Sequence, residues 1–593
     1  MTRFTMTVVA MVLAGTAGAQ QAADAVDPEA ASSGGFEALS PEIAAALEAK
    51  AAGTSVVSDT WMVAAANPHA VQAGADVLAA GGTAADALVA VQVMLGLVEP
   101  QSSGLGGGAF LVWYDAATGQ LTTIDGRETA PLAATPRLFQ DATGEPLGFF
   151  DAVVGGRSVG TPGTPALLAE VHNRWGTKDW PTLLKPAMDL AEAGFTVSPR
   201  LAQLVAGDAE RLASSDITAE YFMPGGTPVQ AGDTLVNLPY AETLGTLAAE
   251  GVGAFYAGDL ARAIVATVQT APGNPGVLSE VDMAIYQVKE RPAVCASYRA
   301  HEVCGMGPPS SGALAVGQTL GMLEGYDLSA GPQDVTVRRL IGDASRLAFA
   351  DRGRYVADSD YVPVPVQGML EPAYLAERGA LLDGDSALEE VAPGTPAFDH
   401  ALNWADDEAI ELPSTSHISI VDAAGNVASM TTTIENGFGS RLMVGGFLLN
   451  NELTDFSFRA HSDGVPIANR VEPGKRPRSS MSPTIVMKDD KPVIAVGSPG
   501  GSRIIGYTTQ AIIGMIDWGM SPQEAAAIPH AVNRFGTYDV EEGTDAEALT
   551  EGLTAAGFEV NARALTSGLH IIAIGDGLRG GADPRREGIA LGD

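Results

Sequence analysis

Apolar and polar residues alternate along the segment from His417 to Asp422, where Ile418 and Ile420 take the apolar positions. A period of two residues is typical of a β-strand that buries one face. The turn residues Ala423-Ala424-Gly425-Asn426 follow, and a second strand is expected from Val427 to Thr433. The pattern therefore predicts two strands joined by a short turn.

Helical patterns dominate the first part of the chain. Asn67-Pro68 combines a capping side chain with a proline suited to the first helical turn, and the predicted helix stops at Gly81-Gly82. Thr83 is the expected cap of a second helix that runs to Pro100. Alternation of helices and strands continues to about residue 380.

The second part of the chain is predicted to consist mostly of strands. Thr484 to Lys488 and Pro492 to Gly497 form a hairpin about Asp489-Asp490, an apolar helix begins near Ser502, and Ser521-Pro522-Gln523-Glu524 is a capping box that opens another helix. Between the two parts, the segment from about Leu382 to Ser414 is rich in Asp, Glu, Gly and Pro, which is typical of an exposed linker. Periodicity alone indicates mixed α and β structure.

Thr415 stands between this linker and the first strand of the hairpin, and that position suggests a chemistry. A threonine hydroxyl is a poor nucleophile because its own side chain carries no base. A cut before Thr415 would create an α-amino group with a pKa of about 8, which can accept the hydroxyl proton. An exposed linker is also where a cut is tolerated. An ordinary strand residue is the alternative interpretation, and this feature alone leaves both open.

The charge balance excludes one class of partner. The 593 residues carry 34 Lys and Arg against 71 Asp and Glu, a formal net charge of -37. Such a chain lacks the basic surface that displaces counterions from nucleic acid, so we expect no nucleic-acid partner.

The first residues have the pattern of a secretory signal. Arg3 precedes an apolar run from about Met6 to Ala14, and the small residues Ala17-Gly18-Ala19 lie before Gln20. No later stretch reaches about 18 uninterrupted apolar residues, so we expect no membrane span and a periplasmic or secreted protein. Residues 20 to about 50 are rich in Ala, Ser, Gly and acids, and we expect them to be mobile.

The two cysteines, Cys295 and Cys304, flank a strand-like segment that contains a possible turn. In an exported protein they could bridge a hairpin, and two buried free thiols are the alternative. Neither cysteine has the neighbours of a zinc site, so we expect no metal.

Two glycine-rich segments are candidates for close backbone contacts. Gly104 to Ala109 formally matches G-x-G-x-x-A, but a helix and Glu99-Pro100 precede it where a dinucleotide site needs a strand, so we expect a tight turn instead. Gly500-Gly501 lies between a strand that ends at Gly497 and the helix near Ser502. Two adjacent N–H groups at a helix N-terminus suit an oxyanion, and an ordinary strand-to-helix turn is the alternative.

The run from Thr415 to Asn426 resembles the start of the small subunit of gamma-glutamyltransferases (gamma-glutamyltranspeptidases), which are N-terminal-nucleophile hydrolases. Further segments that are similar to this family occur in its order: Gly104-Leu105-Gly106-Gly107-Gly108, Asp125 to Pro131, Gly160-Thr161-Pro162-Gly163, Pro308 to Gly312, Asn450 to Phe456, Lys475 to Pro483, Gly497 to Ser502 and Gly581 to Arg585. The resemblance covers roughly residues 55 to 593. It implies an α+β fold, a four-layer αββα sandwich formed jointly by two fragments of one self-cleaved precursor. The implied parts are a signal peptide over 1–19, a large subunit over 20–414 that ends in the acidic linker, and a small catalytic subunit over 415–593.

The resemblance also assigns roles to particular residues. Thr415 is the implied nucleophile, Thr433 orients its hydroxyl, and Gly500 with Gly501 forms the oxyanion hole. The implied substrate-binding residues are Arg127, Ser479 and Ser480 for an α-carboxylate, and Glu435, Glu452 and Asp455, expected on two strands, for an α-ammonium. A guanidinium is the natural bidentate partner of a carboxylate, although without the family Arg127 would be read as a surface residue and Ser479-Ser480 as a turn.

The implied activity is the transfer of γ-glutamyl groups from glutathione and related amides to water or to amino acid and peptide acceptors. A γ-glutamyl ester of Thr415 is the intermediate, and no metal or organic cofactor is implied. The alternatives are a glutaryl or cephalosporin side-chain acylase of the same superfamily and a scaffold protein that is never processed. One departure from the family is the loop between Phe456 and Arg476, which is shorter than the lid of some members and has no aromatic gate.

Overall fold

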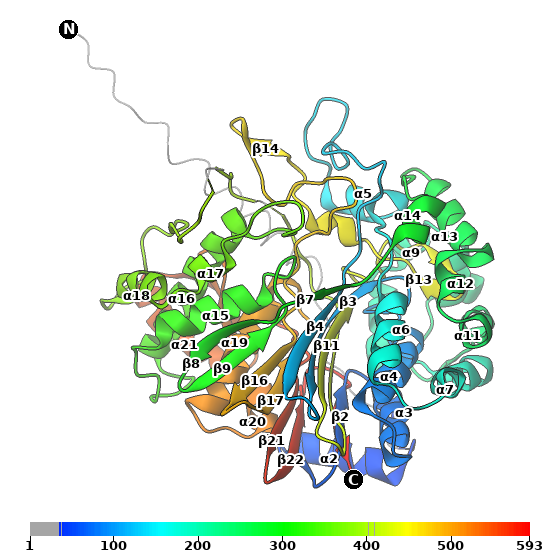
Figure 1. The fold of residues 1–593 in the computed structure, drawn as a ribbon, viewed down its shortest axis with the longest axis horizontal. Coiled ribbons are helices and arrows are strands. Elements are labelled where there is room, and N and C mark those ends of the chain that lie inside the picture. The colour runs from blue at the N-terminus through cyan, green and yellow to red at the C-terminus, as the bar shows by residue number, and fades with distance from the viewer. Residues whose placement is uncertain (1–34, 37, 401–402, 408) are drawn as a thin grey trace.

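The architecture is two stacked β-sheets with helices on both outer faces (Figure 1). The computed structural model describes residues 35–36, 38–400, 403–407 and 409–593. The expected signal peptide over 1–19 and residues 20–34 therefore lie outside the described residues. No helix in the described ranges is both long and apolar enough to cross a membrane.

One sheet holds the strand that follows Thr415 at its centre. Its seven strands are, in spatial order, β23 (Ile589–Gly592), β2 (Met62–Ala65), β10 (Ser416–Val421), β11 (Val427–Thr433), β3 (Gly108–Asp115), β4 (Gln120–Gly126) and β7 (Lys289–Arg291). β10 and β11 pair antiparallel from Ser416 opposite Thr432 to Val421 opposite Val427, which confirms the predicted hairpin. Both strands are buried along their whole length because they lie in the middle of the sheet.

The second sheet also has seven strands. They are β1 (Val56–Ser58), β22 (Gly577–Ala582), β21 (His570–Gly575), β17 (Lys491–Gly497), β16 (Thr484–Lys488), β9 (His301–Gly305) and β8 (Val294–Tyr298). Apolar side chains from both sheets, such as Met62, Val427, Ile485 and Ile572, form the core between them. The predicted hairpin about Asp489-Asp490 is β16 and β17.

Helices cover the outer face of each sheet. On the side of β10 they are α3 (Pro68–Ala79), α4 (Ala84–Val98), α6 (Thr164–Trp175), α7 (Trp180–Ala193), α11 (Leu238–Glu250) and α13 (Asp259–Gln269). On the side of β17 they are α15 (Gly312–Leu323), α16 (Val335–Tyr355), α18 (Pro372–Gly379), α19 (Ile504–Ile516) and α20 (Pro522–Ala527). The order helix, sheet, sheet, helix confirms the four-layer αββα sandwich.

Shorter elements connect these layers. The helices are α2 (Pro41–Ala51), α5 (Phe149–Val153), α8 (Pro199–Gly207), α9 (Ala209–Leu212), α10 (Asp216–Phe222), α12 (Gly253–Tyr256), α14 (Glu280–Ile285), α17 (Val366–Met369) and α21 (Leu549–Ala555). The strands are β5 (Phe195–Thr196), β6 (Thr234–Leu235), β12 (Met443–Val444), β13 (Phe447–Leu448), β14 (His461–Ser462), β15 (Val465–Pro466), β18 (Ala531–Asn533), β19 (Thr537–Glu541) and β20 (Glu559–Arg563).

The predicted helix starts are confirmed by their caps. The Asn67 side chain accepts a hydrogen bond from the backbone N–H of His69 at the start of α3. Thr83 with Asp86 and Ser521 with Glu524 form capping boxes at the starts of α4 and α20.

The predictions of a mobile segment over 20 to about 50 and of an exposed linker are each wrong for the last part of the segment. Helix α2 occupies the end of the segment expected to be mobile. It is anchored to the rest of the protein, because Ile43 is fully buried and Lys50 Nζ donates to the carbonyl of Gly588 at 2.7 Å. The linker is exposed near residues 383–386, but its last residues are buried: Glu411 is 4% exposed and Ser414 is 1% exposed. The chain thus enters the protein before it reaches Thr415.

The two cysteines form a disulfide, which decides between the two alternatives that the sequence left open. Cys295 lies in β8 and Cys304 lies opposite it in β9, so the bridge joins the two strands at one edge of the second sheet.

Candidate active site

The Thr415 hydroxyl is held by the end of the neighbouring strand. Thr415 directly precedes β10, and Thr433 is the last residue of β11. Thr415 Oγ1 donates to Thr433 Oγ1 at 2.9 Å, and the backbone N–H of Glu435 donates to the same Thr433 oxygen at 2.8 Å. Antiparallel pairing of β10 with β11 therefore brings together two hydroxyls that are 18 residues apart in the sequence.

The first glycine-rich segment forms a tight turn against this strand end, as predicted. It follows α4 and leads into β3, which starts at Gly108. A Cβ atom on Gly107 would lie 1.9 Å from the carbonyl oxygen of Thr433. Only glycine allows this approach, so the turn supports the position of Thr433.

The backbone at Thr415 is strained and is held from both sides. Its φ angle is 89°, in the left-handed region that a β-branched residue rarely adopts, at a typical cost of about 1–3 kcal/mol. The carbonyl oxygen of Ser414 accepts from the Gly500 N–H at 3.2 Å, and the carbonyl oxygen of Thr415 accepts from Arg586 Nη1 at 3.1 Å. These contacts fix the peptide bond that joins Ser414 to Thr415.

Gly500 and Gly501 follow β17, as the sequence predicted, and Gly501 begins a 3-10 turn (Gly501–Arg503) that leads into α19. Their φ angles are 135° and 57°, conformations that favour glycine. The Gly500 N–H points at the Ser414 carbonyl oxygen, so it can stabilise negative charge that develops there. Gly501 lines the pocket beside Thr415.

A small pocket opens at Thr415, and the structure brings nine of the ten predicted site residues to its wall. They are Arg127, Thr415, Thr433, Glu435, Glu452, Asp455, Ser479, Ser480 and Gly501. Arg127 just after β4, Thr433 at the end of β11 and the serines of the loop before β16 meet here although they are far apart in the sequence.

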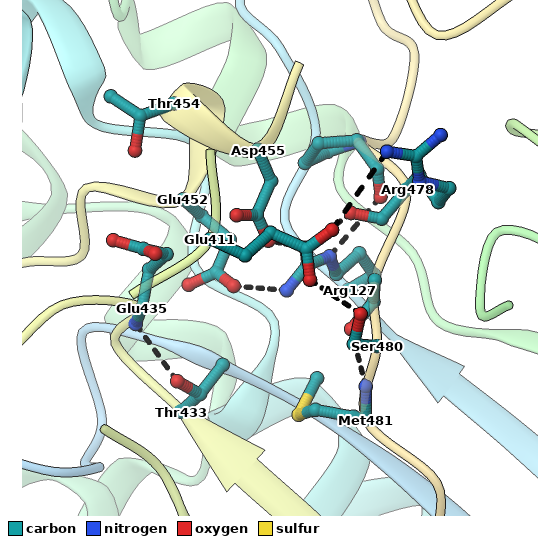
Figure 2. A network of polar contacts seen from close by, with 12 residues as sticks. Arg127, Glu411, Thr433, Glu435, Glu452, Thr454, Asp455, Arg478, Ser480 and Met481 are labelled. Carbon is teal, nitrogen blue, oxygen red and sulfur yellow. Dashed lines mark hydrogen bonds and ion pairs between the residues drawn. The ribbon is translucent and has the colours of Figure 1, made fainter. Parts of the chain in front are cut away.

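Arg127 and two carboxylates form the centre of the pocket (Figure 2). The buried guanidinium donates from Nη1 to Glu452 and from Nη2 to Asp455, and it also contacts the carbonyl of Arg478 at 2.9 Å. The expectation that these acids lie on strands is wrong. Glu452 and Asp455 lie in a 3-10 helix (Glu452–Asp455), and Glu435 lies just after β11.

Two carboxylate oxygens in this pocket have no hydrogen-bond partner among the described residues. They are Glu452 Oε2 and Asp455 Oδ1. Burial raises the pKa of Asp455 well above its ordinary value against the lowering effect of Arg127, and burial with the neighbouring Asp455 and Glu452 raises the pKa of Glu435 well above its own. A cation that enters this pocket would find oxygens ready to accept its hydrogen bonds.

The two serines have different surroundings. Ser479 Oγ accepts from the Met481 N–H at 3.1 Å, and the Ser479 carbonyl accepts from Ser311 Oγ at 2.7 Å. Ser480 Oγ donates to the Glu411 carboxylate and accepts from Arg352 Nη2 at 2.7 Å.

Sequence reasoning missed three residues at this end of the pocket, namely Glu411, Arg352 and Arg478. Glu411 is one acid among many in the linker, and Arg352 lies far away in the sequence on α16. Arg478 stands next to Ser479 in the segment Lys475 to Pro483, and that neighbourhood was a usable signal. Within the loop from Phe456 to Arg476, the structure places a small hairpin of β14 and β15.

Comparisons with known proteins agree with this geometry. A sequence model described as Gamma-glutamyltranspeptidase matches residues 70–593. The chain is 37% identical over 555 residues to the glutathione hydrolase proenzyme of Bacillus subtilis (strain 168), covering 90% of this chain and 92% of that protein. It is 36% identical over 542 residues to the glutathione hydrolase proenzyme of Escherichia coli (strain K12), covering 88% and 90%. The structure is similar to that of cephalosporin acylase from Bacillus halodurans, with a TM-score of 0.81 and 28% identity over 91% of this chain and 97% of that one.

Proposed function

Because this chain belongs to the gamma-glutamyltranspeptidase family, we propose that it is a gamma-glutamyltransferase with glutathione hydrolase activity that matures by cutting itself before Thr415. It takes γ-glutamyl groups from glutathione and related amides and passes them to water or to an amine. The large fragment ends at Ser414 and the small fragment starts at Thr415.

Maturation starts at the bond that Gly500 and Arg586 hold. Thr415 Oγ1 attacks the carbonyl carbon of Ser414 and gives up its proton, the C–N bond breaks, and the nitrogen takes a proton to become the Thr415 α-amine. The product is an ester between Ser414 and Thr415 Oγ1. Water opens this ester and leaves a Ser414 carboxylate and a free Thr415 hydroxyl. The Gly500 N–H on the Ser414 oxygen supports this step because that oxygen becomes negative during the attack.

Turnover uses the same hydroxyl. The Thr415 α-amine accepts the proton of Oγ1 while Oγ1 attacks the γ-carbonyl of the donor, and the proton then passes to the departing amine. The γ-glutamyl ester of Thr415 remains, and water or an acceptor amine releases it. Thr433 orients the attacking oxygen through the 2.9 Å contact between the two hydroxyls.

The observation that carries the choice of substrate is a pair of oxygens, Glu452 Oε2 and Asp455 Oδ1, that have no hydrogen-bond partner in the described part of the chain. They lie in a pocket that also holds Arg127 and Ser480. An α-amino acid head group has both an ammonium and a carboxylate. The acids match the ammonium, and the guanidinium and hydroxyl groups match the carboxylate. A glutaryl group has no ammonium and would leave the acids without a cation.

The alternative is an acylase, and the similarity to a cephalosporin acylase supports it. Hydrolysis of γ-glutamyl-p-nitroanilide and of glutaryl-p-nitroanilide separates the two, because these compounds differ only in the α-amine. We expect the γ-glutamyl compound to be preferred by about 10- to 100-fold in kcat/KM. Asp455→Asn should narrow this gap, mainly by slowing the γ-glutamyl compound. Equal rates on both compounds would favour the acylase.

The alternative that the chain is a scaffold protein, which is never processed, leads to a different prediction. Purified protein would then run as one uncut chain, whereas the proposed enzyme gives two fragments with Thr415 at the start of the smaller one. The disulfide between Cys295 and Cys304 further supports export to an oxidising compartment, the periplasm or the outside of the cell.

A further inference from the structure

The last residues of the linker lie inside the pocket rather than beside it. Glu411 and Leu412 are part of its lining, and they are 4% and 1% exposed. A Cβ atom on Gly501 would lie 2.7 Å from the Leu412 carbonyl oxygen, so the linker runs directly across the second glycine. These residues occupy space that a donor needs in order to reach Thr415.

The Glu411 carboxylate is bound by a set of donors at one end of the pocket (Figure 2). Ser480 Oγ and Arg352 Nη2 both donate to it, and Arg478 Nη2 lies 3.8 Å away. Burial opposes the charged form, yet the guanidinium groups of Arg352 and Arg478 hold the pKa of Glu411 below its ordinary value. The carboxylate is therefore bound as an anion.

These donors are fixed by their own contacts. Arg352 Nε donates to Ser311 Oγ at 2.8 Å, and Ser311 Oγ donates to the Ser479 carbonyl at 2.7 Å. Arg352 is 3% exposed and Arg478 is 1% exposed, so their charges are shielded from water. A buried guanidinium that keeps its geometry without the ligand is suited to bind a carboxylate.

Leu412, the residue after Glu411, contacts one of the buried acids of the pocket. The backbone N–H of Leu412 donates to Glu435 Oε1 at 3.4 Å. The segment thus presents a carboxylate to Arg352 and Ser480 and an N–H donor to Glu435. A zwitterionic amino acid presents the same two groups, a carboxylate and a nitrogen donor.

We propose that Arg352, Arg478 and Ser480 form a carboxylate-binding subsite that Glu411 fills in the uncut chain, and that Ser480 serves the carboxylate of a γ-glutamyl substrate beside Arg127 once Glu411 has left. The identity of that second ligand rests on the proposed function. The two carboxylates exclude each other, because two anions in one small pocket repel and both need the Ser480 hydroxyl. The new end of the large fragment is then a tethered competitor of the donor.

A peptide with the sequence of residues 410–414, Ile-Glu-Leu-Pro-Ser, tests this with the mature two-chain enzyme. We expect it to inhibit hydrolysis of γ-glutamyl-p-nitroanilide competitively, raising KM and leaving kcat unchanged. The same peptide with Gln in place of Glu should inhibit about 10-fold or more weakly, because a neutral amide loses the charged hydrogen bonds. Equal inhibition by the two peptides, or none by either, would overturn the proposal.

Enzyme variants locate the interaction. In Arg352→Gln the Glu peptide should inhibit hardly better than the Gln peptide. In Arg354→Gln, a surface change on the same helix, the Glu peptide should remain the stronger inhibitor. If Arg352→Gln does not mature, Ser480→Ala serves the same comparison. If the difference in inhibition between the two peptides stays the same in Arg352→Gln or in Ser480→Ala, these residues do not bind the Glu411 carboxylate.

A second readout separates this inference from the proposed function. Fluorescence anisotropy of the labelled peptides measures binding without any turnover. Tight binding of the Glu peptide by an enzyme that hydrolyses only the glutaryl anilide would refute the transferase and keep the subsite. Normal γ-glutamyl turnover without peptide discrimination would refute the subsite and keep the transferase.

Discussion

Arg586 donates a hydrogen bond from Nη1 to the carbonyl oxygen of Thr415 at 3.1 Å. The arginine is fully buried and lies six residues from the C-terminal end of β23, in the segment that Lys50 of α2 contacts through the Gly588 carbonyl. The C-terminal segment therefore holds Thr415, the residue at which the proposed small fragment would start. These contacts link the first described helix, through the segment just before the last strand, to Thr415.

Removal of this link should loosen the nucleophile. Arg586→Met keeps most of the side-chain length but no donor, so we expect cleavage to slow and kcat of the mature enzyme to fall by about 10-fold or more. Gel analysis of maturation and steady-state kinetics measure the two effects. Arg579→Met, at an exposed position on β22, is the control and should change neither. Normal maturation and kcat in Arg586→Met would show that the contact plays no part.

The hydroxyl of Thr433 should matter while that of its neighbour should not. Thr433→Val keeps the shape but cannot accept the hydrogen bond from Thr415, so we expect kcat to drop by about 10- to 100-fold. Thr432→Val is a matched control because the buried Thr432 hydroxyl has no hydrogen-bond partner among the described residues. Similar kinetics for the two variants would remove Thr433 from the mechanism.

Donor binding should depend on pH through the buried acids. The pKa values of Glu435 and Asp455 are raised well above their ordinary values, chiefly by burial, so these groups hold protons at a pH where exposed carboxyls do not. A bound ammonium favours the ionised acids, so KM for the γ-glutamyl anilide should fall as pH rises through those pKa values. Glu435→Gln should flatten the dependence. A KM that is independent of pH in the wild type from about pH 5 to about pH 8 would contradict the proposed binding of the ammonium by Glu435 and Asp455.

Glu587 should make folding stability depend on pH. Burial, with Glu99 as the next cause, raises its pKa from 4.5 to about 7. The folded state then binds the proton more tightly than the unfolded state, so this contribution to stability is complete below the ordinary pKa and is lost as pH rises through about 7. Glu587→Gln should gain up to about 2–3 kcal/mol relative to wild type between pH 4 and pH 8. Melting temperatures of both proteins measure this, with the exposed Glu390→Gln as control. A constant difference in melting temperature across this range would argue against a shifted Glu587.

Local sequence patterns predicted much of the fold because their causes are local. The capping boxes at Thr83 and Ser521 and the hairpin after Thr415 depend on residues within a few positions of each other. The stacking of the two sheets depends on an apolar core that holds Val427 of one sheet together with Ile485 of the other, and no periodicity reveals such a core. The stacking of the two sheets was predicted only from the resemblance to the family.

The site was predictable where function is tied to a motif and was missed where it depends on tertiary contacts. All ten predicted residues lie at or beside the pocket, although their roles stay predictions. Arg352 was missed because an arginine on a helix is usually a surface residue, and only the packing of α16 against the loop before β16 buries it. Glu411 was missed for the same reason, because its burial depends on the guanidinium groups of Arg352 and Arg478, which lie elsewhere in the sequence.

The backbone angle at Thr415 makes the cut favour one direction. The φ torsion of Thr415 is defined by the carbonyl carbon of Ser414 and by the N, Cα and C atoms of Thr415. Hydrolysis of the bond between the two residues therefore removes this torsion and its cost of about 1–3 kcal/mol. That energy corresponds to a factor of roughly 5 to 150 in the equilibrium between the joined and separated chains. Religation would have to restore the left-handed conformation at a β-branched residue. The backbone of Thr415 would therefore bias the proposed cut toward the separated chains.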